Sequence, residues 1–523
     1  MSLAHTSLPS ARLARFFSGL LAGLMLLVSS VDAQTAAGGV RGRVFNAASN
    51  EYIRNAEIRV VGTPIVVYSE DGGDFSLTGV PAGEATLVAT YTGLQETRAV
   101  VTVVAGQVVA HDFRLQETSY AGAGTDGEKV VQLEKLEVAG SRSGQAKAIM
   151  ERRASINAKN VVAADNYGEL TMGDVGEFMK SVPGLSLDYV EVDTSAVRIG
   201  GLEPKYSNFT TDGARMATAT SNNNAGRQNS FEQMSITGIE SIEVNNTLTA
   251  SMDADSPGGT INLRSKYAFQ RSGRSIVFQV YGVGTSDAEF KREYFPDDRK
   301  HQRIFPSGQF GYADIFFDGR LGVEFNASYN ANFVQQDRVQ MRYNYNTPAA
   351  GATVETPKLN DILFRPGPKM THREAANLSL DYRLTPELVF SWRSSYSFYD
   401  VEYVNQYTYL YAPVATQPTS SSITRLVANP VNATTGAAVT GGSSPRLRTE
   451  YSHRYAGTPA FVLAPKLEYK GDTWQAALRG SYSRSEFNFR DNSKGFFVRT
   501  DNWISRLGFV AERPSEDSPT WTL

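Results

Sequence analysis

The stretch from Met172 to Lys266 decides the fold, because it holds three blocks of regular elements joined by glycine turns. The blocks read GDVGEFMKSVPGLSLDY from 173, VRIGGLEPKYSNFTTDGARM from 197 and FEQMSITGIESIEVNNTLTASMDADSPGGTINLRSK from 231. In the first block Val175, Phe178, Met179 and Val182 recur at helical spacing up to Pro183-Gly184, which predicts a short helix. Strands are then predicted at Leu185–Val190, Val197–Ile199, Ser207–Thr211, Ile242–Asn245 and Thr260–Ser265.

These blocks resemble the plug domain of TonB-dependent outer-membrane receptors. The family shows a helix followed by VPG(V/L), then an arginine–glycine step closed by DG, then an IE(R/S)IEV step closed by GGxINxxxK. Two departures occur: Arg198 stands one position early, and Asp253–Pro257 replaces the family's more usual residues before the paired glycines. The resemblance implies an α+β plug over Ala146–Lys266, and an unrelated small α+β domain is the alternative.

Composition excludes several classes of protein. The 523 residues exceed one usual domain, and the formal net charge of -3 with scattered Lys and Arg argues against nucleic-acid binding. The chain has no cysteine, so disulfides, thiolate zinc sites and cysteine nucleophiles are excluded, and no apolar run reaches the ~20 residues of a membrane helix. No nucleophile–base pair, phosphate loop or metal cluster stands out, so we expect neither an enzyme nor a cofactor.

The N-terminal part of the chain predicts export followed by a small β domain. Met1–Ala33 has a basic start, a short apolar core and a small-residue end, which is typical of a secretory signal peptide. Gly39–Leu115 has some seven short alternating runs separated by turn residues, which predicts a small β-sandwich. Its text GRVFNA…AEIRVVGT…SEDGGDFSLTGVPAGEATLVATYTG is similar to the carboxypeptidase-regulatory-like domain that precedes the plug in many of these receptors, and this name implies no peptidase activity.

Gln116–Arg142 is predicted to be a linker that ends in a strand able to pair with the edge strand of another sheet. Gly122–Gly127 satisfies GxGxxG, but no helix pattern follows it, so a flexible linker is the interpretation. The alternating residues from Val130 to Arg142 resemble the energy-coupling box of the family, which implies β-augmentation onto the periplasmic protein TonB. The residues expected to contact TonB are Leu133, Glu134, Lys135, Leu136, Glu137, Val138 and Ala139.

From Arg274 to Leu523 apolar and aromatic residues alternate with small or polar ones, which is typical of antiparallel transmembrane β-barrel strands. Short links at Asp318–Arg320, Thr385–Glu387 and Lys470–Asp472 would be periplasmic turns. The longer stretches Asp287–Pro306, Asp337–Thr371 and Asn405–His453 would be outer loops, and a soluble β-sandwich is the alternative. The fold class is therefore mainly β: a small sandwich, an α+β plug and a partial barrel.

The sequence after the plug is too short to supply all the strands of a barrel that encloses a plug. Receptors with a plugged lumen have about 22 strands, whereas the 257 residues after Lys266 (523 minus 266) hold only about eight to ten. We expect the chain to be the N-terminal portion of a longer receptor.

Two sets of plug residues are candidates for function. The polar loop Ala217–Asn229 would face an external ligand by resemblance, with Asn222, Asn223, Asn224, Arg227 and Gln228 as contacts, although a plain solvated loop fits the same residues. Arg198, Arg215, Glu240 and Glu243 lie on or beside plug strands and are expected to pair with charges of the barrel wall, with ordinary exposed strand charges as the alternative.

The resemblance implies an outer-membrane receptor that imports a scarce solute, energised through the TonB complex. Its partners would be TonB, outer-membrane lipid and a small-molecule or metal-chelate ligand of the ferric siderophore, cobalamin or oligosaccharide class, with the N-terminal domain in the periplasm. The alternatives are a passive outer-membrane barrel or surface adhesin with a vestigial plug, and a periplasmic scaffold that works through its N-terminal sandwich.

Overall fold

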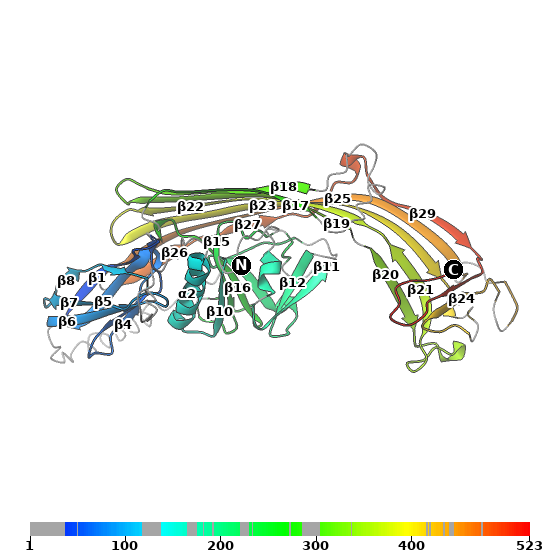
Figure 1. Cartoon of the computed structure of the whole chain (residues 1–523), viewed down its shortest axis with the longest axis horizontal. Helices are drawn as coiled ribbons and strands as arrows, with labels where there is room; N and C mark the ends of the chain where they lie inside the picture. The colour runs from blue at the N-terminus through cyan, green and yellow to red at the C-terminus, as the bar shows by residue number, and fades with distance from the viewer. Residues whose placement is uncertain are drawn as a thin grey trace, which may run out of the picture.

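The computed structural model has three parts: an N-terminal β domain, a plug, and a long curved sheet, here called the wall (Figure 1). It describes residues 37–49, 51–117, 138–164, 175–180, 182–190, 193–219, 230–232, 234–250, 252–270, 273–284, 304–335, 337–414, 417, 420–431, 435–438, 444–471 and 474–523. The predicted signal peptide lies outside these residues.

The N-terminal domain is a sandwich of two sheets, as the alternating runs predict. One sheet centres on β1 (Ala37–Asn46), which pairs with β2 (Glu51–Tyr52), β5 (Asp74–Pro81), β8 (Val108–Ala110) and β9 (Phe113–Leu115). The other runs in the order β4 (Val66–Tyr68), β3 (Glu57–Val60), β6 (Gly83–Thr90), β7 (Thr97–Val103). Inward residues such as Leu77, Leu87 and Phe113 are almost fully buried between the sheets.

Helix α2 (Val138–Ala154) joins the N-terminal domain to the plug. The prediction of a strand up to Arg142 is therefore wrong for residues 138–142, because these residues form the first turns of this helix. The rest of that predicted strand lies outside the described residues.

The plug is an α+β unit whose elements fall where the motifs place them. Its main sheet has the order β10 (Lys159–Ala163), β15 (Ile239–Asn245), β16 (Gly259–Ser265), β13 (Ser207–Thr211), β14 (Ala214–Arg215). A hairpin of β11 (Leu185–Val190) and β12 (Asp193–Ile199) lies beside the short helix α3 (Val175–Met179). Val175, Phe178, Met179 and Val182 are all buried in the plug core, which confirms the helical spacing.

The wall is a sheet of 12 strands among the described residues, antiparallel throughout. Its longer strands are β17 (Ser275–Gly284), β18 (Ile304–Phe316), β19 (Leu321–Gln335), β22 (Pro368–Arg383), β23 (Leu388–Tyr411), β25 (Arg446–Lys470) and β29 (Phe497–Ser505). The shorter ones are β20 (Arg338–Asn344), β21 (Lys358–Arg365), β26 (Gln475–Arg479), β27 (Tyr482–Ser485) and β28 (Asn488–Phe489). The three predicted short links join β18 to β19, β22 to β23 and β25 to β26 at one end of the sheet, here called the short-turn end.

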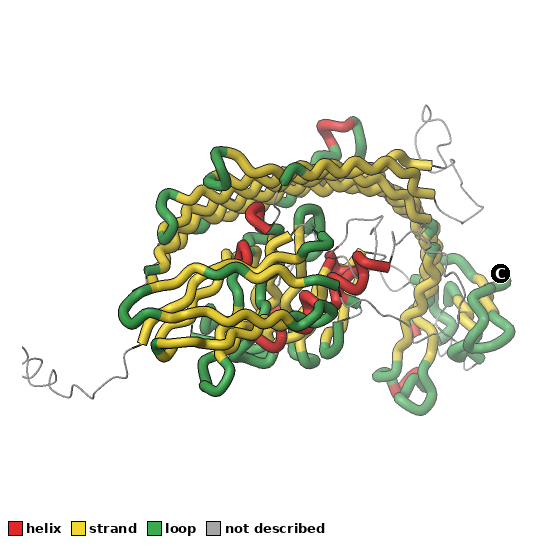
Figure 2. The backbone as a smooth tube through the Cα atoms, turned by 60° about the vertical axis from the view of Figure 1, so that its left-hand side comes forward, coloured by secondary structure: helices red, strands yellow, loops and turns green. Residues whose placement is uncertain are grey.

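The two faces of the wall differ in chemistry, as period-2 alternation requires. One row across the sheet, on the convex face, runs through Phe278, Phe310, Tyr396 and Phe461, all of them exposed. The adjacent row, one residue along, contains Asn326 and Asn377 and faces the plug. The plug lies against this polar, concave face, as Figures 1 and 2 show.

Two predicted outer loops contain regular strands. The stretch Asp337–Thr371 forms the β20–β21 hairpin and the start of β22, and β23 and β25 extend far into the predicted loop Asn405–His453. The tyrosines that continue the alternation at every second position keep these residues extended. A small sheet of β24 (Arg425–Ala428) and β30 (Phe509–Glu512) packs on the convex side through Leu410 and Leu426 (Figure 2). Within the described part of the chain, no helix has both the length and the apolarity to cross a membrane.

Candidate functional site

The seam between plug and wall centres on the buried carboxylate of Asp193 at the start of β12. Arg373 Nη2 on β22 lies 2.9 Å from Asp193 Oδ1, Lys369 Nζ bonds Oδ2, and the Tyr399 hydroxyl donates to Oδ2 at 3.2 Å. All four side chains are buried. Burial alone raises the pKa of Asp193, but the Arg373 and Lys369 charges outweigh it and lower this pKa to about 2. The carboxylate is thus an ionised anchor that fixes the hairpin to two wall strands.

A second contact fixes the loop before β15 to the middle of the wall. Asn377 Nδ2 donates to the Thr237 carbonyl, and the Thr237 and Ser328 hydroxyls are 2.6 Å apart. Gly238 has φ +72°, and a Cβ there would come within 3.1 Å of Asn326 Nδ2 and 3.2 Å of Asn377. Only glycine combines this left-handed backbone with so close an approach to the wall.

The segment that leads from plug to wall makes a third contact. The Ala268 amide donates to Asp381 Oδ2 at 3.4 Å, and Asp381 also accepts bonds from Ser391 and Arg393. The Arg383 guanidinium lies 4.0 Å from the Phe269 ring centroid. These polar contacts hold the plug to one face of the wall, and Val462 of β25 packs into the plug core beside them.

The four residues predicted to pair with the wall have other partners in the structure. Arg198 pairs with Asp188 across the β11–β12 hairpin at 2.8 Å, and Arg215 pairs with Asp255 within the plug at 2.9 Å. This corrects the prediction for both, because register places their side chains beside carboxylates of the plug itself.

Glu240 and Glu243 face α2 and the N-terminal domain. Glu240 lies 3.6 Å from Lys147 and accepts a bond from Gln270, whereas Glu243 pairs with Lys159 and Arg264. They lie on the plug sheet on the side of α2, so the prediction that they pair with the wall is corrected as well.

The remaining predicted site residues fall mostly outside the described residues. These are the five candidate ligand contacts, Asn222, Asn223, Asn224, Arg227 and Gln228, and Leu133–Glu137 of the predicted TonB contact. Val138 and Ala139 begin α2. The residues just before the polar loop are fixed to the wall, since the Ala217 and Ala219 amides donate to Ser483 Oγ and Ser485 Oγ at 2.7 and 3.2 Å.

Beyond the plug, the concave face of the wall carries a ladder of arginines and aromatic rings that sequence reasoning missed. Arg446 lies 4.5 Å from the ring centroids of both Tyr411 and Trp503, and Arg448 lies 5.0 Å from Tyr409 and 4.9 Å from Trp503. These residues share the face of Tyr399, because the β23–β25 register is unbroken between them. Arg448 also pairs with Glu450 and, at 2.9 Å, with Asp501, so carboxylates of the wall already balance its charge. What such a surface offers is therefore mainly ring faces, which suit planar groups or sugars. The alternation of Tyr407, Tyr409 and Tyr411 was the sequence signal that could have predicted this ladder.

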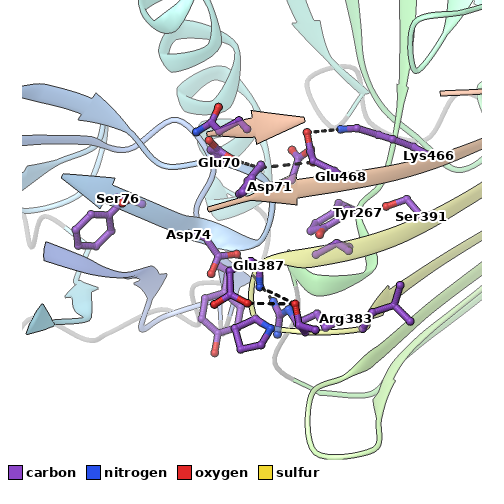
Figure 3. Close-up of a pocket in the computed structure, with 18 of the residues that line it drawn as sticks. Glu70, Asp71, Asp74, Ser76, Tyr267, Arg383, Glu387, Ser391, Lys466 and Glu468 are labelled. Carbon is purple, nitrogen blue, oxygen red and sulfur yellow. Dashed lines mark hydrogen bonds and ion pairs between the residues drawn. The ribbon is translucent and has the colours of Figure 1, made fainter. Parts of the chain in front are cut away.

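A large cavity of about 1920 Å³ lies between the N-terminal domain, the plug and the short-turn end of the wall (Figure 3). Figure 3 shows Glu70, Asp71 and Asp74 of the N-terminal domain reaching toward it from one side. Arg383, Glu387, Lys466 and Glu468 line it from the wall. Many of its lining residues are charged, and apolar residues such as Phe75, Val389 and Pro465 lie among them; it is here called the charged cavity.

Comparison with known proteins identifies two domains of the chain. Residues 39–116 match the carboxypeptidase regulatory-like domain, and residues 151–260 match the TonB-dependent receptor plug domain. No curated protein is significantly similar in sequence to the chain.

Solved structures that resemble the chain include three bacterial receptors. A mutant ferric enterobactin receptor from Pseudomonas aeruginosa is 12% identical, with a TM-score of 0.32 over 71% of this chain and 61% of that one. The alcaligin outer membrane receptor from Bordetella pertussis is 10% identical, with a TM-score of 0.27 over 70% and 61%. A siderophore receptor from Acinetobacter baumannii is 12% identical, with a TM-score of 0.28 over 71% and 60%. The chain thus spans about 60% of the length of these structures.

Proposed function

We propose that this chain, which carries a TonB-dependent receptor plug domain behind a carboxypeptidase regulatory-like domain, imports a scarce solute across the outer membrane. Energy would come from TonB, which would bind Leu133–Ala139 in the periplasm. The observation that supports this best is the seating of the plug: its buried Asp193 is anchored on the polar face of a sheet whose other face carries exposed aromatic rings.

The form of the plug–wall seam suits a plug that has to move. Asp193, Thr237 and Ala268 each make a local polar contact with the wall, and polar pairs can exchange for water one at a time. A continuous apolar interface would have to separate all at once. The short-turn end of the wall, with the N-terminal domain beside it, would then be the periplasmic end.

The ligand would bind at the opposite end. We propose that it contacts the arginine–aromatic ladder on the wall and the five polar-loop residues, Asn222, Asn223, Asn224, Arg227 and Gln228. The ring faces of the ladder suit both the planar groups of a metal chelate and the rings of an oligosaccharide. The fixed residues Ala217 and Ala219 would hold the start of the loop on the same wall.

Deletion of Leu133–Ala139 tests the energised step. Cells that express the full receptor gene with or without this deletion are supplied with ferric siderophores, cobalamin or oligosaccharides as limiting nutrients, and uptake is followed with labelled solute. Deletion of the seven residues Tyr120–Asp126 in the same linker is the matched control. We expect the first deletion to abolish uptake of one solute class and the control to retain it. Uptake that survives the first deletion would refute energised import.

A further inference from the structure

Six charged side chains join the N-terminal domain to the plug in a closed ring of alternating sign. Asp71 lies 3.3 Å from Arg54 and 3.2 Å from Arg264. Glu243 lies 3.5 Å from Arg264 and 3.8 Å from Lys159. Glu151 lies 2.8 Å from Lys159 and also pairs with Arg54, which closes the ring.

The ring draws on three parts of the chain. Arg54 and Asp71 belong to the N-terminal domain, Glu151 belongs to α2, and Lys159, Glu243 and Arg264 belong to plug strands β10, β15 and β16. Every member has two partners of opposite charge, so no single pair holds the two domains together alone. Asn55 and Asn262 add hydrogen bonds to Glu151 and Glu243 at 2.6 and 3.3 Å.

Several side chains of the ring are buried, so the interactions between its charges are only weakly screened by water. The side chains of Glu151, Lys159 and Glu243 are only 8 to 10% exposed, whereas Asp71 is 35% exposed toward the cavity. Burial alone raises the pKa of Asp71, but Arg264 and Arg54 lower it to about 2. Asp71 is therefore ionised at neutral pH, and removing any member of the ring leaves two partners without full compensation.

Helix α2 lies between the two domains and bridges them twice. One turn before Glu151, Lys147 lies 3.8 Å from Glu51 of the N-terminal domain and 3.6 Å from Glu240 of the plug. Lys147 and Glu151 are four residues apart, so they lie on one helix face. A displacement of α2 along its axis would therefore break the ring and the Lys147 bridge together.

The N-terminal domain also contacts the short-turn end of the wall directly. Lys470 pairs with Glu70, Arg41 lies 3.8 Å from Glu387, and Asp74 lies 3.9 Å from Arg383. These wall residues flank the charged cavity, so the domain covers this end of it (Figure 3). These contacts with the wall are more exposed than the ring: the side chains of the Lys470–Glu70 and Arg41–Glu387 pairs are 36 to 44% exposed. The ring is accordingly the stronger of the two attachments.

We propose that the N-terminal domain is a lid over the charged cavity and that the six-membered ring is its latch, released when α2 moves. This rests on the proposed function in one respect, namely that force applied to the plug would reach α2. The closed state and its latch are properties of the resting protein, and they can be tested without transport.

The test measures how easily a bulky reagent enters the cavity. The 523 residues contain no cysteine, so the thiol introduced by Ala464→Cys, on β25 in the cavity lining, is the only one among them; any cysteine elsewhere in the receptor is replaced by serine. Purified full-length receptor with this substitution is treated with a small maleimide or with a polymer-linked maleimide. We expect the small reagent to label it readily and the bulky one slowly.

Opening the latch should admit the bulky reagent. Arg54→Gln or Glu151→Gln is expected to raise the rate of bulky labelling about tenfold, and Glu70→Gln, which removes one exposed wall contact, only about twofold. Arg98→Gln breaks an exposed pair with Glu96 within the N-terminal domain and should leave the rate unchanged. The small reagent should react equally with all of them.

Three results would overturn the proposal. These are bulky labelling that is as fast in the parent as in the ring variants, an equal rise in Arg98→Gln, and a parallel rise with the small reagent, which would mean general loss of structure. None of these outcomes depends on uptake. If deletion of Leu133–Ala139 leaves transport intact but the labelling pattern is as expected, the latch stands and energised import does not.

Discussion

The plug is attached to its two neighbours by different kinds of electrostatic contact. Toward the wall, one carboxylate, Asp193, is enclosed by two cations with side chains only 7 to 8% exposed. Toward the N-terminal domain, six charges share the attachment, and Asp71 and Arg264 are 35% and 27% exposed. The Asp193 contact, one of several between plug and wall, is therefore strong and depends on a single carboxylate, whereas the ring is distributed and partly screened by water. Four measurements sharpen or break this contrast.

The largest effect is expected for Asp193→Asn. The substitution keeps the shape of the side chain but leaves Lys369 and Arg373 buried without a counter-charge, so we expect a loss of about 3 kcal/mol in the free energy of unfolding. Denaturant titration of the purified protein measures this loss. Asp188→Asn, at the exposed Arg198 pair of the same hairpin, is the control and should show no measurable change. Equal behaviour of the two variants would contradict the anchor role.

Acidification should reproduce part of this loss. The pKa of Asp193 is about 2 in the folded protein against an ordinary 3.8, so its contribution is fully present above about pH 5 and is lost as the pH falls from there through 2. The expected loss is about 2 kcal/mol. Stability curves of the parent and Asp193→Asn should converge over this window. If the two curves stayed parallel, protonation of Asp193 would not be the cause of the loss of stability at low pH.

A smaller effect is expected when one member of the ring is neutralised. Glu151→Gln should cost about 1–2 kcal/mol, because Arg54 and Lys159 each retain a second partner in the ring. The sharper measurement is a double-mutant cycle between Arg54 and Glu243, which do not pair directly but are joined through the ring. A coupling of about 0.5–1 kcal/mol is expected. Strict additivity would mean that the pairs act separately.

The smallest effect concerns the close approach at Gly238. Gly238→Ala adds a Cβ against Asn326 and Asn377, at a backbone that disfavours side chains. Gly319→Ala is matched to it, since Gly319 has φ +85° but no atom within 4 Å of the position that the new methyl group would take. We expect Gly238→Ala to cost about 1 kcal/mol more than Gly319→Ala in unfolding free energy. Equal costs would show that the wall yields at this point.

Local pattern predicts most of the fold. Turn chemistry around Pro183-Gly184 and Asp212-Gly213 places the plug elements to within a few residues, and alternation after Arg274 predicts the two-faced wall. The errors lie where pattern is ambiguous. Residues 138–142 alternate like a strand yet begin a helix, and the tyrosines from Tyr403 to Tyr411 extend a strand into a predicted loop.

The contacts between the N-terminal domain, the plug and the wall could not be predicted from local sequence pattern. Asp193 is one aspartate among many in the sequence, and only the fold brings it to Arg373, 180 residues away. The ring likewise joins Asp71 to Arg264 across 193 residues. Glu243 was identified as a charged plug residue, but its partner depends on which side of the sheet faces α2. Pairing between domains is a property of tertiary register, and a single sequence carries no local signal of it.

The alternation of the wall makes it intolerant of a change in chain length. Removing one residue from the middle of β22 would reverse the facing of one part of the strand relative to the other. If the part before the deletion turned over, Lys369 and Arg373 would exchange sides with Met370 and His372. The two cations would then project from the convex face, and Met370 and His372 would face the plug in their place. A point substitution in one of these strands removes one interaction at a time, whereas the deletion of a single residue would exchange the two faces of a whole strand segment.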